Sequence, residues 1–160
     1  GYETAPVTTA AGPVMMPHIR NNARVMFDDT EAAGDLFERV FGVIPARWRS
    51  VQVGDDTWSA IGLNERFRFY RYASNQNFAM HRDGFFQRSD VERSMLTLLI
   101  YLNEPVAGGA TNIVTLDDVT AVEPKPGRSL MFAHGLLHEG EAVTEGVKYV
   151  LRSDVMYTKT

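Results

Sequence analysis

The chain has 160 residues, of which 44% are hydrophobic, and this suits a single domain with one packed core. Its formal net charge of −4, with no block of lysine and arginine, argues against a general nucleic-acid-binding protein. The absence of cysteine excludes disulfide bonds and thiolate metal sites.

The first 17 residues differ in composition from the rest of the chain. They are small, polar and punctuated by proline. This composition predicts a flexible N-terminal arm over residues 1–17, or a segment added to a sheet edge. Residues 18–160 are then predicted to form a single domain.

One helix is clearly predicted, over residues 31–41. Its apolar side chains fall on one helical face, at Leu36, Phe37, Val40 and Phe41. Asp29 or Thr30 can cap its start, and Gly42 follows its end. The apolar face predicts that this helix packs on a sheet.

From about residue 50 onward, the pattern is typical of β-structure. The segment 95–102 is continuously apolar, as expected for a strand buried on both sides. Glycine and proline turns separate the predicted strands, which cover residues 66–72, 95–102, 111–116, 119–122, 129–133 and 147–157. One helix followed by roughly eight short strands favours a mainly β fold, a sandwich or jelly roll.

The most informative residues are His81 and Asp83, followed further along the chain by His138. Residues two apart on a strand point the same way, so His81 and Asp83 can share a face. Two histidines and one carboxylate are the ligand set of non-haem Fe(II) oxygenases. The His-x-Asp pattern alone is weak, because such tripeptides occur by chance on many surfaces.

His134 competes with His138 for the role of the distal ligand. The spacing of four residues would suit a helical metal-binding pair, but the preceding residues are typical of a strand and Gly135 interrupts the run. We therefore prefer His138, and we interpret His134 as a structural residue or one that supports the ligands.

The last predicted strand carries two cations on one face. Its alternation places Lys148 and Arg152 on the same side as Asp154, and mostly apolar residues on the other side, which can pack on the helix. A cation in the pocket would need an anionic partner. A dicarboxylate co-substrate would provide one, and Asp154 could pair with Arg152. The alternative is a row of charges that faces solvent.

Two further features remain open at this level. Tyr72, nine residues before His81, could bond the same co-substrate carboxylate or could be an ordinary core tyrosine. The polar segments 21–24 and 84–94 could line an entrance or form surface loops.

Several segments, in this order, resemble the prolyl 4-hydroxylase-like branch of the 2-oxoglutarate- and Fe(II)-dependent dioxygenases, from about residue 58 onward. The spacing from His138 through Gly140, Val143 and Gly146 to Lys148 is the most specific part. Phe78 departs from the family, which often has tyrosine there. The similar segments are RFYRYASNQNFAMHRDG, LLIYLNEPVAGGAT, PKPGRSLMF and HEGEAVTEGVKYVLRSDVMY.

This resemblance implies a double-stranded β-helix, or jelly roll, with the N-terminal helix packed on one sheet. It implies that His81, Asp83 and His138 bind Fe(II) and act as the catalytic residues. It implies that Lys148 binds the far carboxylate of 2-oxoglutarate, aided by Tyr72 and Thr111. Arg152 is the competing residue for that carboxylate, or a residue that holds the substrate.

The implied activity is hydroxylation of an unactivated C–H bond, with consumption of O2 and release of succinate and CO2. Ascorbate is the expected reductant. The substrate is a peptide or a small molecule, with a peptidyl proline as one candidate and a free amino acid or small metabolite as the alternative. Two other functions stay open: a non-catalytic jelly-roll module that senses 2-oxoglutarate or metal, and a zinc hydrolase with the same three ligands.

The sequence also predicts where the protein does not act. No apolar run approaches the roughly 18 residues of a membrane-spanning helix, and no signal peptide is visible. With the absence of cysteine, this predicts a cytoplasmic protein with no membrane or nucleic-acid partner.

Overall fold

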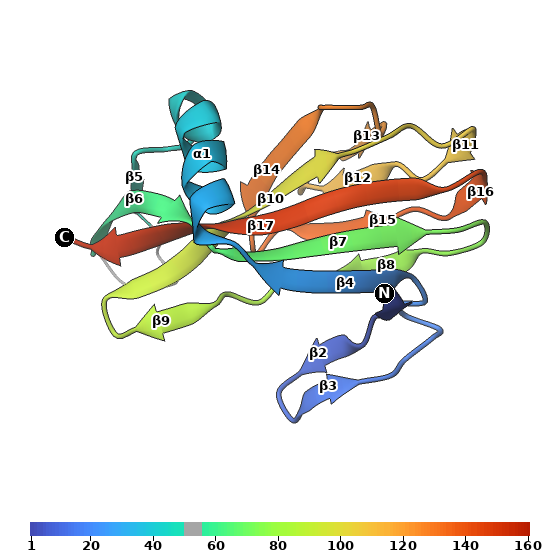
Figure 1. The fold of residues 1–160 in the computed structure, drawn as a ribbon, viewed down its shortest axis with the longest axis horizontal. Helices are drawn as coiled ribbons and strands as arrows, with labels where there is room; N and C mark the ends of the chain where they lie inside the picture. Colours follow the sequence, from blue (N-terminus) through green and yellow to red (C-terminus); the bar gives the residue numbers. More distant parts are fainter. Residues whose placement is uncertain (50–55) are drawn as a thin grey trace.

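The computed structural model describes residues 1–49 and 56–160, and it is mainly β with one α-helix (Figure 1). The predicted onset of β-structure, at about residue 50, lies outside the described residues. No helix of the described ranges is both long enough and apolar enough to cross a membrane.

The larger of the two main sheets has nine strands within the described residues. Its longest strands, β17 (Lys148–Lys159) and β10 (Glu92–Tyr101), pair antiparallel at its centre. Smaller strands extend it: β5 (Arg47–Arg49) pairs with β6 (Thr57–Leu63), β6 with β17, and β9 (Gln87–Ser89) with β10. The main path runs in the order β1 (Glu3–Thr4), β4 (Ala23–Asp28), β7 (Arg66–Tyr72), β17, β10 and β14 (Ser129–Ala133).

A second, four-stranded sheet completes the jelly roll. Its strands are, in spatial order, β13 (Val119–Val122), β12 (Thr111–Val114), β15 (Leu137–Gly140) and β8 (Phe78–His81). Residues of both sheets line one cavity, so this cavity lies between the sheets. The predicted jelly roll is confirmed. Two short pairs flank it, β11 (Ala107–Gly108) with β16 (Val143–Glu145) and β2 (Val7–Thr9) with β3 (Gly12–Val14).

Helix α1 (Thr30–Val40) covers one face of the larger sheet (Figure 1). Asp29 caps it, because its side chain accepts a hydrogen bond from the Ala32 backbone at 2.9 Å. A single 3-10 turn, η1 (Phe41–Val43), follows. Val155 and Tyr157 of the last strand belong to the same core cluster as the apolar face of the helix, whereas Tyr149 contacts Tyr2 instead, with ring centroids 6.2 Å apart.

The N-terminal segment adds to the sheet and then forms a hairpin. Strand β1 pairs with β4 at the edge of the larger sheet, and Ala5 is fully buried. The hairpin of β2 and β3 projects from the body of the domain (Figure 1). The edge pairing is the arrangement of an added edge segment. The flexibility of residues 1–17 and the domain boundary at residue 18 stay predictions.

Candidate metal centre

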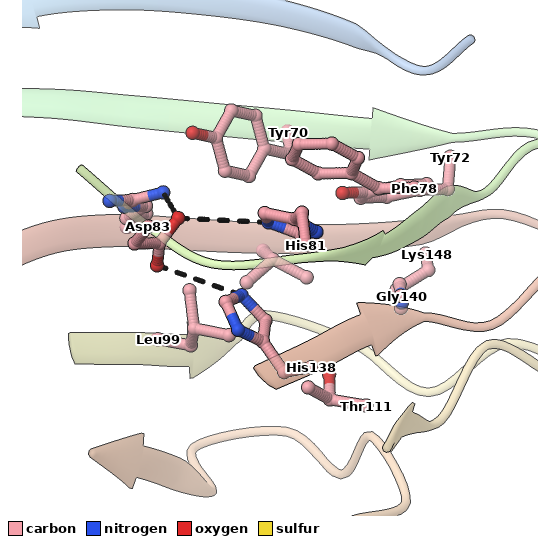
Figure 2. Close-up of a pocket in the computed structure, with 12 residues that line it drawn as sticks. Tyr70, Tyr72, Phe78, His81, Asp83, Leu99, Thr111, His138, Gly140 and Lys148 are labelled. Carbon is pink, nitrogen blue, oxygen red and sulfur yellow. Dashed lines mark hydrogen bonds and ion pairs between the residues drawn. The ribbon is translucent and has the colours of Figure 1, made fainter. Parts of the chain in front are cut away.

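Three side chains meet at the mouth of the cavity between the two sheets (Figure 2). His81 ends β8, Asp83 follows two residues later, and His138 lies on β15 directly opposite His81. One ligand atom from each of these residues lies within 4.8 Å of the others. The fold therefore brings together the three residues that the sequence predicted as ligands.

The hydrogen bonds of the two histidines fix which ring nitrogen faces Asp83. Nδ1 of His81 lies 2.8 Å from the Ala79 carbonyl oxygen, and Nδ1 of His138 lies 2.9 Å from that of Leu136. Because a carbonyl only accepts, each Nδ1 carries a proton, and in the neutral imidazole the lone pair is then on Nε2. Both Nε2 atoms lie 3.6 Å from a carboxylate oxygen of Asp83. In this orientation Nε2 is the ring nitrogen that each histidine can offer to a metal.

Asp83 is held ionised by its neighbours. Its Oδ1 accepts from the Arg152 guanidinium at 2.7 Å, and its Oδ2 accepts from the Thr97 hydroxyl at 2.6 Å. Burial alone would raise the pKa of Asp83, but the Arg152 charge and these hydrogen bonds outweigh burial and hold it well below its usual range. Burial lowers the pKa of His138, which favours its neutral form. A donor set of two imidazoles and one carboxylate fits Fe(II).

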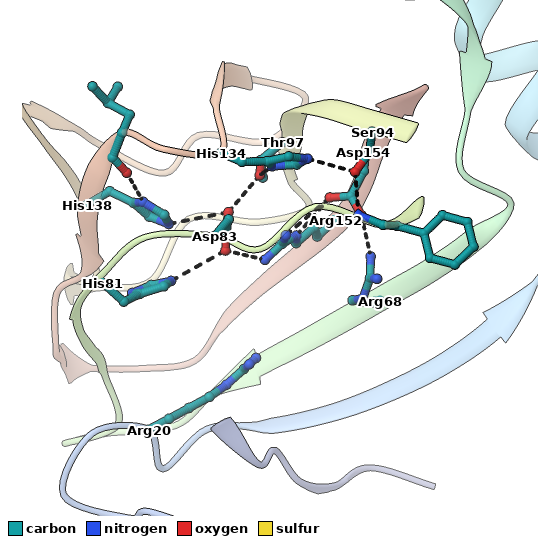
Figure 3. Close-up of polar contacts among 12 residues, drawn as sticks. Arg20, Arg68, His81, Asp83, Ser94, Thr97, His134, His138, Arg152 and Asp154 are labelled. Atoms are coloured by element: carbon teal, nitrogen blue, oxygen red, sulfur yellow. Dashed lines mark hydrogen bonds and ion pairs between the residues drawn. The ribbon is translucent and has the colours of Figure 1, made fainter. Parts of the chain in front are cut away.

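His134 supports this centre from behind (Figure 3). Its Nδ1 lies 2.9 Å from the Thr97 hydroxyl and its Nε2 lies 2.8 Å from the Ser94 hydroxyl. Its carbonyl oxygen accepts from the Asp83 backbone at 2.9 Å. Since Thr97 donates to Asp83, it accepts from His134, so both ring nitrogens are engaged. His134 is therefore not free to bind a metal, as its structural interpretation predicted.

Lys148 lies at the other end of the same cavity, which we call the inner pocket (Figure 2). The residue is 1% exposed, and its Nζ donates to the Gly109 carbonyl oxygen at 2.6 Å. Burial lowers the pKa of Lys148 to about 8. Nζ of Lys148 lies over the ring of Tyr72, 4.5 Å from the ring centroid. Thr111 lines the same pocket.

Arg152 shares this pocket but has carboxylate partners. Besides Asp83, its guanidinium contacts Asp154 at 3.2 Å. Burial alone would lower the pKa of Arg152, but these two carboxylates raise it above its ordinary value. The predicted alternation of the strand is confirmed, because Lys148, Val150 and Arg152 all line the inner pocket.

Comparisons with known proteins agree with this geometry. Residues 67–153 match the 2OG-Fe(II) oxygenase superfamily. The chain belongs to this superfamily. The family predicted from the sequence motifs is thereby confirmed. Among curated proteins, no significant match to the oxygenase was found.

Solved prolyl hydroxylases share the fold of the oxygenase. A Pseudomonas putida prolyl-4-hydroxylase is 19% identical with a TM-score of 0.62, over 86% of this chain and 73% of that one. A viral collagen prolyl hydroxylase from Paramecium Bursaria Chlorella virus-1 is 22% identical with a TM-score of 0.58, over 89% and 82%. A Trichoplax adhaerens prolyl hydroxylase is 15% identical with a TM-score of 0.68, over 95% and 70%.

Both polar segments predicted to line an entrance to the oxygenase contribute residues to a second cavity, although not with every residue. Arg24 and Gly84 to Phe86 line a second cavity that reaches His81 and Asp83. Asn22, in contrast, is fully buried and accepts a hydrogen bond from Arg20 at 2.8 Å. Phe78, where the family often has tyrosine, stacks on His81 with ring centroids 3.5 Å apart.

Sequence reasoning missed two contributors to the centre of the oxygenase. Thr97 holds Asp83, and its signal was a lone hydroxyl within a continuous apolar run. Arg20 stacks on Phe78 beside His81, with its guanidinium carbon 4.4 Å from the Phe78 centroid. No local pattern marks Arg20, because a contact across 58 positions of the chain places it there.

Proposed function

We propose that the protein is a 2-oxoglutarate- and Fe(II)-dependent hydroxylase in which His81, Asp83 and His138 bind the iron. The observation that carries this proposal is the convergence of their ligand atoms within 4.8 Å, with both histidines held through Nδ1 by backbone carbonyl oxygens. Membership of the oxygenase superfamily supports it.

The cofactors would supply the redox chemistry. When Fe(II) and 2-oxoglutarate are bound, O2 is consumed, one oxygen atom enters a substrate C–H bond as hydroxyl, the other enters succinate, and CO2 leaves. The protein itself orients the reactants and excludes water. Its three ligands leave open coordination positions for this purpose. Ascorbate is the proposed reductant that keeps the iron in its Fe(II) state.

Lys148 is the proposed anchor for the far carboxylate of 2-oxoglutarate. Its buried ammonium contacts only a backbone carbonyl among the hydrogen bonds of the described residues, whereas Arg152 is already paired with Asp83 and Asp154. An incoming carboxylate would offset the cost of burying the Lys148 charge. Tyr72 and Thr111 would add hydroxyl contacts from the same pocket. Arg152 is then the residue that orients Asp83.

Peptidyl proline is the first substrate that we propose to test. Its support is the fold shared with prolyl hydroxylases, one of which was solved with a peptide fragment of hypoxia inducible factor and another with 2-oxoglutarate. These are properties of those proteins, so the position hydroxylated here is a question for experiment.

The first experiment measures succinate formation from 2-oxoglutarate under air, with Fe(II) and ascorbate. We expect succinate that requires iron and disappears in His138→Ala, and a proline-containing peptide should raise its rate. A parallel calorimetric titration measures 2-oxoglutarate binding. Binding without turnover on any peptide would favour the sensor module, and neither binding nor turnover would overturn the proposal.

A further inference from the structure

A second cavity reaches the metal centre and is rich in positive charge. It shares His81 and Asp83 with the inner pocket, but Lys148, Tyr72 and Thr111 line only the inner pocket. We call this second cavity the arginine cleft, after the arginines that line it: Arg20, Arg24, Arg68, Arg82 and Arg152. The co-substrate anchor and this cluster therefore lie in different cavities that meet at the metal ligands.

The carboxylates of the cleft do not balance its arginines. Two carboxylates of the described residues line it, and both are engaged, Asp83 by Arg152 and Asp154 by Arg152 and by Arg68 at 3.1 Å. Arg82 donates to the carbonyl oxygen of Gly135. Within residues 1–49 and 56–160, neither Arg20 nor Arg24 forms an ion pair. Fe(II) and 2-oxoglutarate carry opposite charges of equal size, so their binding leaves this excess in place.

Arg20 gives the strongest indication that the cleft binds an anion. The residue is 5% exposed, and its Nε donates to Asn22 at 2.8 Å. Its Nη2 is buried and has no hydrogen-bond partner among the described residues. A buried guanidinium group with an unused donor is costly until a ligand satisfies it. In Figure 3 no contact joins Arg20 to the network around Asp83 and Arg152.

Aromatic rings hold Arg20 in place beside the metal centre. Its guanidinium carbon lies 4.7 Å from the ring centroid of Tyr70 and 4.4 Å from that of Phe78. Phe78 in turn stacks on His81, one of the proposed iron ligands. A group bound to Arg20 would therefore lie close to the reacting centre in a fixed orientation.

Neighbouring groups respond to the excess positive charge. Burial lowers the pKa of Arg24, and the charges of Arg20 and Arg68 lower it further. Burial would raise the pKa of Tyr70, but the guanidinium groups around it outweigh burial and lower it. Both shifts agree with a positive potential that an anionic ligand would relieve.

We propose that the substrate carries an anionic group, of which a carboxylate is the simplest case, and that this group binds Arg20 and Arg24 in the arginine cleft. The guanidinium fork matches a carboxylate in two parallel hydrogen bonds. A neutral analogue would leave the buried arginine donors unpaired, so the cleft would reject it. This inference rests on the proposed hydroxylase function, because it names the substrate class of that site.

The test uses matched pairs of compounds that differ by one charge. Aspartate and asparagine, and glutamate and glutamine, are offered as free amino acids and within otherwise identical proline-containing peptides. At saturating 2-oxoglutarate, each compound is scored for its effect on succinate formation and, by calorimetry, for binding to the protein. We expect the acid of a pair to bind and stimulate about tenfold better than its amide. The free and peptide arms distinguish a small acid from an acidic peptide.

Variants of the cleft localise the preference. Arg24→Gln should lose the preference for the acid by about tenfold, and Arg24→Lys should retain most of it because the charge remains. Arg71→Gln is the matched control, because Arg71 also lies on the larger sheet, on β7, but lines neither cavity. Arg20→Lys tests the buried site with less risk to folding than Arg20→Gln, and thermal melts check each variant.

The outcomes separate this inference from the function beneath it. Iron-dependent succinate formation with equal responses to acid and amide in every pair would overturn the anionic substrate and leave the hydroxylase intact. An acid preference that survives Arg24→Gln, or falls equally in Arg71→Gln, would also overturn it. If the wild-type protein neither binds nor turns over 2-oxoglutarate, the hydroxylase proposal fails. The calorimetric preference for acids then still decides whether the cleft binds anions.

Discussion

In the described part of the chain, the inner pocket and the arginine cleft share one paired cation, Arg152, and differ in the unpaired cations that each one holds. In the inner pocket, Lys148 is buried against a backbone carbonyl. Arg152, which lines both cavities, is instead paired with Asp83 and Asp154. Lys148 and Arg152 lie four residues apart on one face of β17, so their neighbours, not their position, separate their roles. A cation already paired holds the site together, and a cation left unpaired awaits a ligand.

Removing a proposed iron ligand should have the largest effect, because the two cavities meet at His81 and Asp83. His81→Ala, Asp83→Ala and His138→Ala should each lower iron-dependent succinate formation by more than about a hundredfold, with the fold retained, because two ligands hold Fe(II) weakly. Anaerobic calorimetry with Fe(II) should show the same loss of binding. His18→Ala, at an exposed histidine outside both cavities, is the control. Unchanged activity in any ligand variant would contradict the iron site.

Arg152→Met should destabilise the protein, because it removes the cation that is already paired. It leaves two buried carboxylates with fewer partners, and we expect the free energy of unfolding to fall by about 3 kcal/mol. Urea denaturation of the metal-free protein measures this change. Lys148→Met is the contrasting variant, because it removes a buried charge that has no carboxylate partner among the described residues, and it should not destabilise the unliganded protein. If the two variants behave alike, the distinction between paired and unpaired cations is wrong.

Lys148→Met should instead weaken the binding of 2-oxoglutarate. Its affinity for 2-oxoglutarate should fall about a hundredfold, because truncating one member of a buried charge pair is costly once the ligand is bound. Calorimetric titration with 2-oxoglutarate measures it, and Lys148→Arg restores a charge as the control. An intact Lys148→Met affinity, together with a lost affinity in a folded Arg152→Met protein, would reverse the assignment of the two cations.

Local patterns in the sequence predicted one wall of the site. The alternation of β17 needs only a period of two, so the shared face of Lys148 and Arg152 followed from the residues alone. The helix face that packs near Val155 and Tyr157 followed in the same way. The role of each cation did not follow, because it depends on where Asp83 and Gly109 arrive in space.

Long-range pairing decided the remainder. Strands β8 and β15 are four residues each and mix polar with apolar residues, so their periodicity does not predict them. Their pairing nevertheless places His81 opposite His138. Strand β4 escaped prediction because Met26 and Phe27, neighbours on the strand, are both exposed. The His-x-Asp pattern and the family resemblance, rather than periodicity, predicted the three candidate metal ligands.

Thr97→Val tests how far the support behind Asp83 reaches. It removes a hydroxyl that donates to Asp83 at 2.6 Å and links it to His134. We expect Fe(II) affinity to fall about tenfold, as is typical when a group that orients a metal ligand is lost. Thr97→Ser retains the hydroxyl and should restore most of the affinity. A Thr97→Val protein with wild-type Fe(II) affinity would show that Arg152 alone orients Asp83.

The pH dependence of 2-oxoglutarate affinity gives the finest distinction between the two cations. Burial lowers the Lys148 pKa from 10.5 to about 8, so in the unliganded protein its charge is lost as pH rises through that value. The protonated fraction falls roughly tenfold between about pH 7 and about pH 9, and the calorimetric affinity for 2-oxoglutarate should follow it. Lys148→Arg, which stays charged, should lack this dependence.

The same shift sets the sign for stability. Between about pH 8 and pH 10.5 the unfolded chain binds more protons at Lys148 than the folded protein does, so this residue makes the unfolding free energy rise with pH. Its destabilising contribution is fully present below pH 8 and is lost as pH approaches 10.5. The difference between wild-type and Lys148→Met unfolding free energies, measured in urea across this window, isolates it. A difference that grows with pH would mean that the Lys148 ammonium already has a buried partner and is not held for the co-substrate.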